Sequence, residues 1–286
     1  MRKDLFWAPV VRQFSRLVVF LLAGSLVVLG VAGCSSVEAT TKASAPVQPT
    51  VLITGASRGI GFELARQYAE LGWGVIATCR TPEQATALQA LANAAPNVRV
   101  EELDVTDFDE MNRLAQRYAG IPVDLLINNA GILGGNDRQK FGTFDYAAFD
   151  EVMAVNVIGA LRMTELFVGN VASSQQKKIM NISSAVGSVS MTFGGQNFYR
   201  ASKAALNMSM RTIAKELRYS DMPGRSEIIV GLIHPGVVAT DFAKNVPIPM
   251  IEPEESAAAV IEVIAGYKDR RQSGDFMSYT GKELPW

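Results

Sequence analysis

The chain has 286 residues, of which 48% are hydrophobic and 19% are charged, and its formal net charge is −1. This balance is typical of a globular protein with enough apolar residues for a sizeable core, and it gives no indication of a nucleic-acid partner. Two cysteines and one histidine exclude a disulfide scaffold and a histidine-rich metal centre. We expect that histidine, His234, to be structural rather than catalytic, which argues against a Ser-His-Asp hydrolase.

Residues 1–34 have the three-part order of a secretory signal: basic residues, an uncharged apolar stretch over residues 17–32, and small residues around Cys34. The sequence VAGC, residues 31–34, resembles the lipobox of bacterial lipoproteins, in which the cysteine is acylated after cleavage. This resemblance implies a membrane-associated lipoprotein whose domain faces away from the cytoplasm. The alternative is an uncleaved anchor helix, including one that keeps the domain in the cytoplasm.

Residues 35–49 are small and polar, include proline and show no periodicity, which is typical of a flexible tether. From residue 50 onward, short β-rich runs alternate with longer amphipathic ones. Several of the short runs are apolar nearly throughout, as expected for strands that are covered on both faces. We predict strands over residues 50–54, 74–79, 98–105, 124–129, 178–183 and 227–233.

Helix signals lie between these strands. Apolar residues at helical spacing predict a helix over residues 60–71, and Thr81 followed by Pro82 predicts the capped start of a second helix. Asp107 and Glu110 form a capping-box pattern that predicts the start of a third. Further helices are predicted over residues 149–168, 199–218 and 254–265.

The alternation of strand and helix predicts right-handed βαβ units, and therefore a parallel sheet with helices on both faces. No second linker interrupts residues 50–286, so we predict one doubly wound α/β domain of the Rossmann type. In such a sheet the turn after the first strand holds the pyrophosphate of a dinucleotide. The sequence TGASRGIG places Gly55, Gly59 and Gly61 in that turn, where close approach of the backbone requires glycine.

Three further motifs follow in order. NNAG, residues 128–131, ends the fourth predicted strand; NISS, residues 181–184, ends the fifth; and YRASK, residues 199–203, opens a long helix. Together with the glycine turn they resemble the short-chain dehydrogenase/reductase superfamily. The segments HPGVVATDF and GDFMSYTGKELPW resemble the branch that contains C-factor-like and Sniffer-like carbonyl reductases. The resemblance implies an oxidoreductase that moves hydride between a nicotinamide and a carbonyl or alcohol substrate.

Tyr199 and Lys203 are four residues apart and share one face of the predicted helix. The resemblance implies that Tyr199 exchanges a proton with the substrate oxygen, and that Lys203 lowers the pKa of this phenol and holds the nicotinamide ribose. It also implies Ser184 as the donor to the carbonyl oxygen, with Ser183 as the alternative. Asn156 matches the position that holds a water molecule for proton transfer. The long segment between Ser184 and Tyr199 predicts a loop that shapes the substrate mouth.

The end of the second predicted strand bears on the choice of dinucleotide, because NAD-selective sites place a carboxylate there. This chain has Cys79 followed by Arg80, and Arg58 in the glycine turn is a second cation. Two guanidinium groups suit a 2′-phosphate, so we predict NADP(H) rather than NAD(H). The other cofactor-binding residues that the resemblance implies are Gly55, Ser57, Gly59, Ile60, Gly61, Asp104, Val105, Asn129, Ala130, Gly131, Val238 and Thr240, together with Tyr199 and Lys203.

These motifs predict an NADP(H)-dependent carbonyl reductase that acts on a small molecule and needs no metal. The alternative is a dinucleotide-binding signalling or sensor protein with little or no turnover, which the C-factor resemblance and the leader favour. The complete set of catalytic residue types favours the enzyme. Because members of the superfamily commonly pair their long helices across subunits, the resemblance also implies a homo-oligomer.

Overall fold

The structure is a computed structural model of the chain, and it describes residues 48–240, 242 and 249–286. The predicted leader, residues 1–34, lies outside the described residues, and so does all of the predicted tether except its last two residues. Lipidation at Cys34, the anchor helix and the membrane location therefore stay predictions. The domain predicted from residue 50 onward lies within the described part, apart from residues 241 and 243–248.

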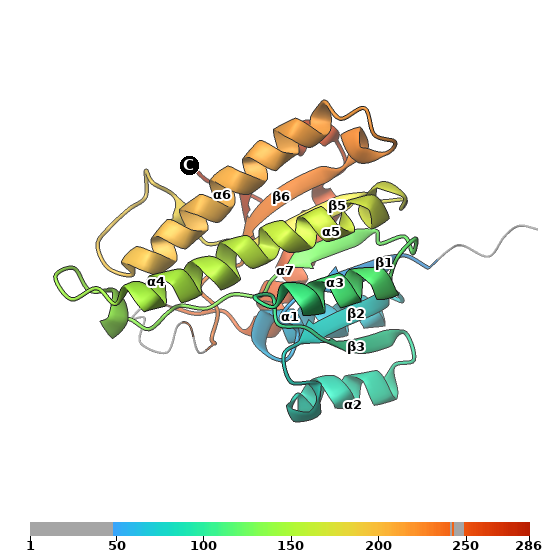
Figure 1. Cartoon of the computed structure of the whole chain (residues 1–286), viewed down its shortest axis with the longest axis horizontal. Coiled ribbons are helices and arrows are strands. Elements are labelled where there is room, and N and C mark those ends of the chain that lie inside the picture. The colour runs from blue at the N-terminus through green and yellow to red at the C-terminus, as the bar shows by residue number, and fades with distance from the viewer. Residues whose placement is uncertain (1–47, 241, 243–248) are drawn as a thin grey trace, which may run out of the picture. The chain divides into compact units, whose positions relative to one another are not determined.

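The domain is built on one parallel sheet of seven strands in the order β3-β2-β1-β4-β5-β6-β7 (Figure 1). The strand order reverses between β1 and β4, and such a switch point is where doubly wound sheets bind ligands. The predicted fold class is confirmed. The strands are β1 (Thr50–Ile53), β2 (Gly74–Cys79), β3 (Val98–Glu102), β4 (Leu125–Asn128), β5 (Lys178–Ile182), β6 (Ile229–His234) and β7 (Phe276–Ser278).

Helices cover both faces of this sheet (Figure 1). Three of them pack on one face: α1 (Gly59–Glu70), α2 (Thr86–Ala94) and α7 (Pro253–Gly266). Four cover the other face: α3 (Phe108–Arg117), α4 (Tyr146–Met153), α5 (Ala160–Ala172) and α6 (Asn197–Arg218).

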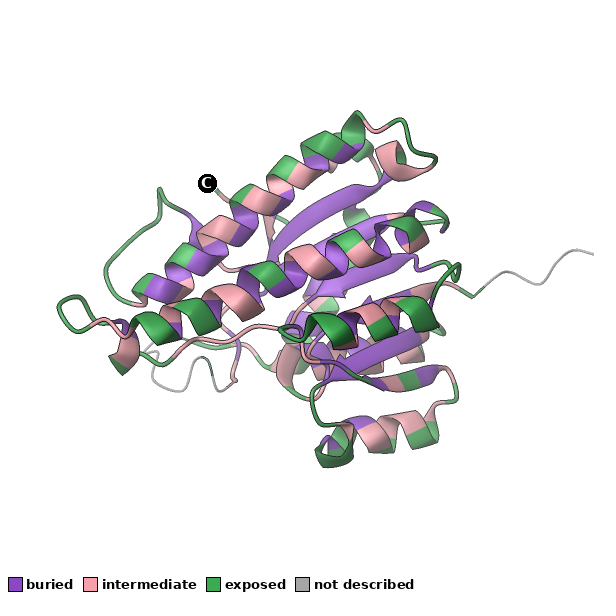
Figure 2. Cartoon of the chain, viewed as in Figure 1, coloured by how far each residue is buried: buried purple, intermediate pink, exposed green. Residues whose placement is uncertain are grey.

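Alternate residues of each central strand pack against the helices on opposite faces of the sheet. In β1, Leu52 packs with α3, α5 and α6, whereas Val51 and Ile53 pack with α1 and α7, and all three are fully buried. Figure 2 shows the central strands buried along their length, with the exposed residues on the outer sides of the helices. Burial on both faces is why these strands read as continuous apolar runs.

A π-helical turn, Ala154–Gly159, joins α4 to α5, so the helix predicted over residues 149–168 is part of one longer helical run. Over Tyr146–Ala172 this run is long and apolar enough to cross a membrane, but half of its most apolar stretch is buried inside the domain. Packing against the sheet therefore accounts for its apolar character.

The predicted helix start at Thr81 is wrong. Pro82–Gln84 forms a separate 3₁₀ turn, and α2 begins only at Thr86. The Thr81 side chain makes no capping hydrogen bond within the described part of the chain. The backbone N–H of Ala85 bonds back to the carbonyl of Pro82, and this closes the turn before a helix can propagate.

The capping box predicted at the start of α3 is half formed. The Asp107 carboxylate accepts hydrogen bonds from the backbone N–H groups of Asp109 and Glu110. The Glu110 carboxylate accepts from the N–H of Asp104 instead of returning to Asp107. It thereby fixes the loop that follows β3, which borders the site described next.

Candidate active site

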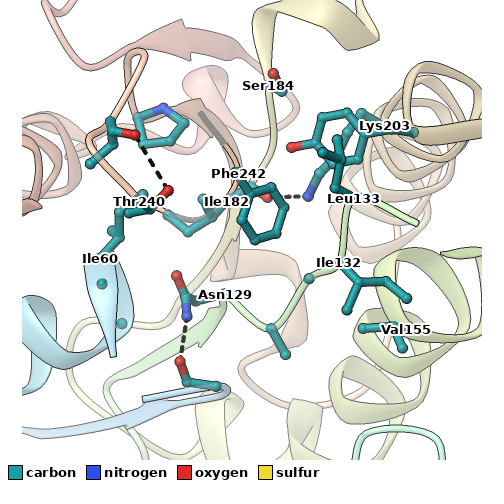
Figure 3. Close-up of a pocket in the computed structure, with 18 of the residues that line it drawn as sticks. Ile60, Asn129, Ile132, Leu133, Val155, Ile182, Ser184, Lys203, Thr240 and Phe242 are labelled. Atoms are coloured by element: carbon teal, nitrogen blue, oxygen red, sulfur yellow. Dashed lines mark hydrogen bonds between the residues drawn. The ribbon is translucent and has the colours of Figure 1, made fainter. Parts of the chain in front are cut away.

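The carboxyl ends of β1, β4, β5 and β6 open onto a cavity of about 1130 Å³. All of the catalytic and cofactor-binding residues singled out from the sequence line this cavity, except Asn156, which is buried behind it. Figure 3 shows Ile60 and Thr240 on one side of the cavity and Lys203, Leu133 and Val155 on the other. The structure therefore brings four motifs that are far apart in the sequence into one site.

The glycine turn and the NNAG motif are in direct contact. Gly55 has φ +68°, and a Cβ on this residue would lie 2.9 Å from the Cα of Ala130. A Cβ on Gly61 would lie 2.3 Å from the carbonyl oxygen of Gly55. The Asn129 side-chain amide donates to the carbonyl oxygens of Thr54 and Gly55, at 2.8 and 3.0 Å, and Figure 3 shows one of these two hydrogen bonds. The two glycines are thus required by close packing between the end of β1 and the end of β4.

The end of the cavity beside the glycine turn carries two arginines. Arg58 immediately precedes α1, Arg80 follows β2, and both are exposed at the cavity wall. Cys79, the last residue of β2, is buried. Asp104 also lines this end, but its carboxylate accepts two hydrogen bonds from Thr106 in its own loop. The amides at the start of α1 and the two guanidinium groups make this end suitable for an anion.

Tyr199 and Lys203 line the cavity from the first two turns of α6. The Lys203 Nζ donates to the carbonyl oxygen of Ile182 at 2.9 Å and lies 5.7 Å from the centre of the Tyr199 ring (Figure 3). Burial lowers the pKa of Lys203 to about 8. Burial also raises the pKa of Tyr199 to about 12, and hydrogen bonding to Ser184 opposes that rise in part.

The direction of the Tyr199 shift differs from the expected one. The resemblance implied that the Lys203 ammonium lowers the pKa of the phenol, whereas in the protein alone the pKa of the phenol is raised. The reason is the loss of hydration on burial, which disfavours the phenolate. The phenol therefore keeps its proton at neutral pH.

The two serines of the NISS motif have different partners. The Ser183 hydroxyl is buried and donates to the Asn207 side-chain carbonyl at 2.5 Å. The Ser184 hydroxyl accepts from the backbone N–H of Val186 at 3.4 Å. The proton of Ser183 is thus already used, whereas Ser184 shares the cavity with the phenol.

Asn156 lies in the π-helical turn between α4 and α5. Its side chain donates to the carbonyl oxygen of Ile132 at 2.9 Å and to the Ser202 hydroxyl at 3.0 Å, and it accepts from the N–H of Ile132 at 2.8 Å. Both amide hydrogens are therefore used to join the loop after β4 to α6. A water molecule at this position would therefore have to bind the backbone. In a π-helical turn the backbone carbonyl groups do not make the regular hydrogen bonds of an α-helix.

The segment after Ser184 forms a short 3₁₀ turn, Ala185–Gly187, and then an exposed loop, as predicted. We call residues 188–196 the mouth loop. Its start is fixed by the N–H of Ser190, which donates to the carbonyl oxygen of Trp286. The Phe242 ring lies 6.0 Å from the Tyr199 ring, centre to centre, so aromatic side chains border the mouth.

Sequence reasoning missed Gln139, which is only 1% exposed. Its side-chain carbonyl accepts from the backbone N–H groups of Phe198 and Tyr199, at 3.0 and 3.1 Å, at the N-terminus of α6. Its amide donates to the carbonyl oxygens of Leu133 and Gly135, at 2.9 and 3.1 Å. Gln139 thus fixes the start of α6 against the loop after β4. No motif marks this residue, because its partners come together only in the fold.

Comparisons with known proteins agree with this fold. The model of the family described as short chain dehydrogenase matches residues 49–249. The chain belongs to this family. The C-signal protein of Myxococcus xanthus is 34% identical over 177 residues, which cover 62% of this chain and all of that protein.

Two solved structures of the family are similar over 84% of this chain and the whole of theirs. They are an NADPH-bound carbonyl reductase from chicken fatty liver, with 30% identity and a TM-score of 0.74, and the carbonyl reductase Sniffer of D. melanogaster, with 26% identity and a TM-score of 0.73. The superfamily that the motifs indicated is thereby confirmed, and the C-signal protein and the carbonyl reductases are among its similar proteins.

Replacing Gln139 by Met tests its role at the start of α6. The variant leaves two buried N–H groups and two carbonyl groups without their partner, so we expect the free energy of unfolding to fall by about 2–4 kcal/mol. The control is Lys140→Met, which removes a surface ion pair with Asp137 and should change stability by less than about 0.5 kcal/mol. Urea unfolding measures both. Equal stability of the two variants would show that Gln139 has no such role.

The lowered pKa of Lys203 predicts how stability depends on pH. Between pH 8 and 10.5 the unfolded chain keeps the proton on this lysine and the folded chain has released it, so stability rises with pH in this window. The rise is on the order of 3 kcal/mol and should be missing in Lys203→Met. Urea unfolding at the two ends of the window measures it. Parallel pH curves for wild type and variant would contradict the burial of a titrating lysine.

Proposed function

We propose that this short-chain dehydrogenase is an NADP(H)-dependent carbonyl reductase or alcohol dehydrogenase that acts on a small molecule. The observation that carries the proposal is the meeting of Ser184, Tyr199 and Lys203 in one cavity with the glycine turn. Carbonyl reduction requires of a protein a proton donor, a hydroxyl group that donates a hydrogen bond, and a cation, all beside a turn that binds a dinucleotide.

The residues at the glycine-turn end fit NADP(H). Gly55 and Gly61 form a backbone cradle that a Cβ would fill. Arg80 follows the end of β2, where NAD-selective sites have a carboxylate, and Arg58 in the glycine turn supplies a second cation. The chicken carbonyl reductase, which has the same fold, is bound to NADPH. The bound dinucleotide would supply the hydride, and the protein supplies position, a proton and hydrogen bonds.

The proposed proton donor is Tyr199. Because its pKa is raised to about 12, the phenol is protonated across the neutral range and ready to give its proton to a carbonyl oxygen. Ser184, the proposed second donor, lines the same cavity as the phenol and would stabilise charge on that oxygen. Lys203, with a pKa of about 8, is mostly charged at neutral pH, and this charge favours any phenolate left after proton transfer.

Replacing Tyr199 by Phe removes the proton donor and little else. We expect carbonyl reduction to fall by about a thousandfold, while the Kd for NADPH stays within about threefold of wild type. The control is Tyr219→Phe at the other end of α6, where the side chain is 84% exposed. NADPH oxidation over a panel of aldehydes and ketones measures turnover, and fluorescence titration measures binding. A wild-type rate in Tyr199→Phe would rule out the mechanism.

The same panel decides between the enzyme and a dinucleotide-binding sensor. The similarity to the C-signal protein is the observation that favours a signalling role. NADPH binding without turnover of any carbonyl or alcohol by the wild type would support the sensor. Turnover that depends on Tyr199 would support the enzyme.

The preference for NADP(H) is proposed to come from Arg58 and Arg80. Replacing both by Gln should raise the Kd for NADPH by about ten- to a hundredfold, because charge-assisted hydrogen bonds to the 2′-phosphate are lost, and should leave the Kd for NADH nearly constant. The control is Arg113→Gln, an exposed arginine of α3 outside the cavity lining. Fluorescence titration with each dinucleotide measures the effect. An equal loss of affinity for NADPH and NADH would show that the selectivity comes from other residues.

A further inference from the structure

Next to Tyr199, a cation that the proposed mechanism does not use lines the cavity. Arg200 follows Tyr199 in α6, lines the cavity, and is only 9% exposed. A guanidinium keeps its charge in proteins, and burying that charge is costly unless it is paired. The place of Arg200 in the fold therefore needs an explanation.

Arg200 is held against the mouth loop by two contacts. Its Nε donates to the carbonyl oxygen of Gly195 at 2.8 Å. Its Cζ lies 4.0 Å from the centre of the Phe193 ring, so the guanidinium plane is covered on one face. These contacts fix the orientation of the group, but they use only one of its five N–H bonds.

Part of the guanidinium has no hydrogen-bond partner among the described residues. Its Nη1 is buried and has no hydrogen-bond partner among the described residues. Burial lowers the pKa of Arg200, and no acidic group among the described residues opposes this shift. A buried N–H without an acceptor destabilises the protein, and a buried charge without a counter-ion does so more strongly.

The carboxylates that line the cavity do not serve as this counter-ion. Glu151 pairs with Arg138, at 2.9 and 3.2 Å. Asp104 belongs to the opposite, glycine-turn end and accepts from Thr106. Arg200 and Lys203 therefore give the part of the cavity next to Tyr199 an excess of positive charge.

We infer that Arg200 binds a carboxylate of the substrate, so that the preferred substrates are carbonyl compounds that also carry an acidic group. This inference rests on the proposed function, since it names the substrate class of the same site. A guanidinium binds a carboxylate through two parallel hydrogen bonds. Because Nη1 is buried without a partner among the described residues, such a carboxylate would have to approach it from the cavity that Arg200 lines. The apolar side chains of Leu133, Val186 and Phe242 would contact the part of the substrate between its two polar ends.

A matched pair of substrates tests this inference. 4-Formylbenzoate and its methyl ester have the same reactive aldehyde and differ in the charge at the far end of the ring. We expect the wild type to have a kcat/KM about ten- to a hundredfold higher for the acid than for the ester. In Arg200→Gln this acid-to-ester ratio should fall by about tenfold or more. Arg200→Lys keeps the positive charge but lacks the paired N–H donors of a guanidinium, and it should restore part of the ratio.

Arg211→Gln is the control, because Arg211 lies on the same helix and also stacks on an aromatic ring, that of Trp286, outside the cavity lining. Its acid-to-ester ratio should match that of the wild type. A wild type without preference for the acid would overturn the inference. So would an Arg200→Gln variant that loses activity on both substrates equally, because that result would make Arg200 only a support for the mouth loop.

A binding measurement separates this inference from the proposed function. Calorimetric titration with terephthalamate and with uncharged terephthalamide, neither of which has an aldehyde, reports the carboxylate site without turnover. Tighter binding of terephthalamate to the wild type, lost in Arg200→Gln, would support the anion site even if no aldehyde were reduced. Equal binding of the two compounds would overturn it.

Discussion

The site depends on the contact between the ends of β1 and β4. The Asn129 amide binds the carbonyl oxygens of Thr54 and Gly55, and the backbone there is packed so closely that a side chain on Gly55 or Gly61 would collide with it. This contact forms where the strand order reverses, so it sets the cavity that the dinucleotide and the substrate are proposed to share. Loosening it would widen the turn and displace the start of α1.

Burial and charge act against each other around the phenol. In the protein alone the loss of hydration holds the proton on Tyr199 and weakens the hold of Lys203 on its own proton. Both shifts reduce charge in a poorly hydrated cavity. The proposed reduction needs a protonated phenol, and the loss of hydration keeps the proton on Tyr199.

The sequence predicted the sheet well because its strands are covered on both faces and read as apolar runs, as in residues 74–79. It predicted which motif residues meet in the cavity, because the glycines follow the first strand and Tyr and Lys lie at the start of a helix. It failed at Thr81, where a local capping pattern was outweighed by a 3₁₀ turn. It could not show Gln139 or Arg200, whose roles depend on partners brought near only by the fold.

The mouth loop is held near its two ends, at Ser190 by the carbonyl of Trp286 and at Gly195 by Arg200. The backbone of Tyr199 is held separately, by the Gln139 side chain. Changes in the loop between those two points, other than at Phe193, which stacks on Arg200, therefore leave the proposed proton donor in place. Such an arrangement allows relatives to diverge in what they recognise without rebuilding their chemistry, and it makes this loop the natural place to graft a new specificity.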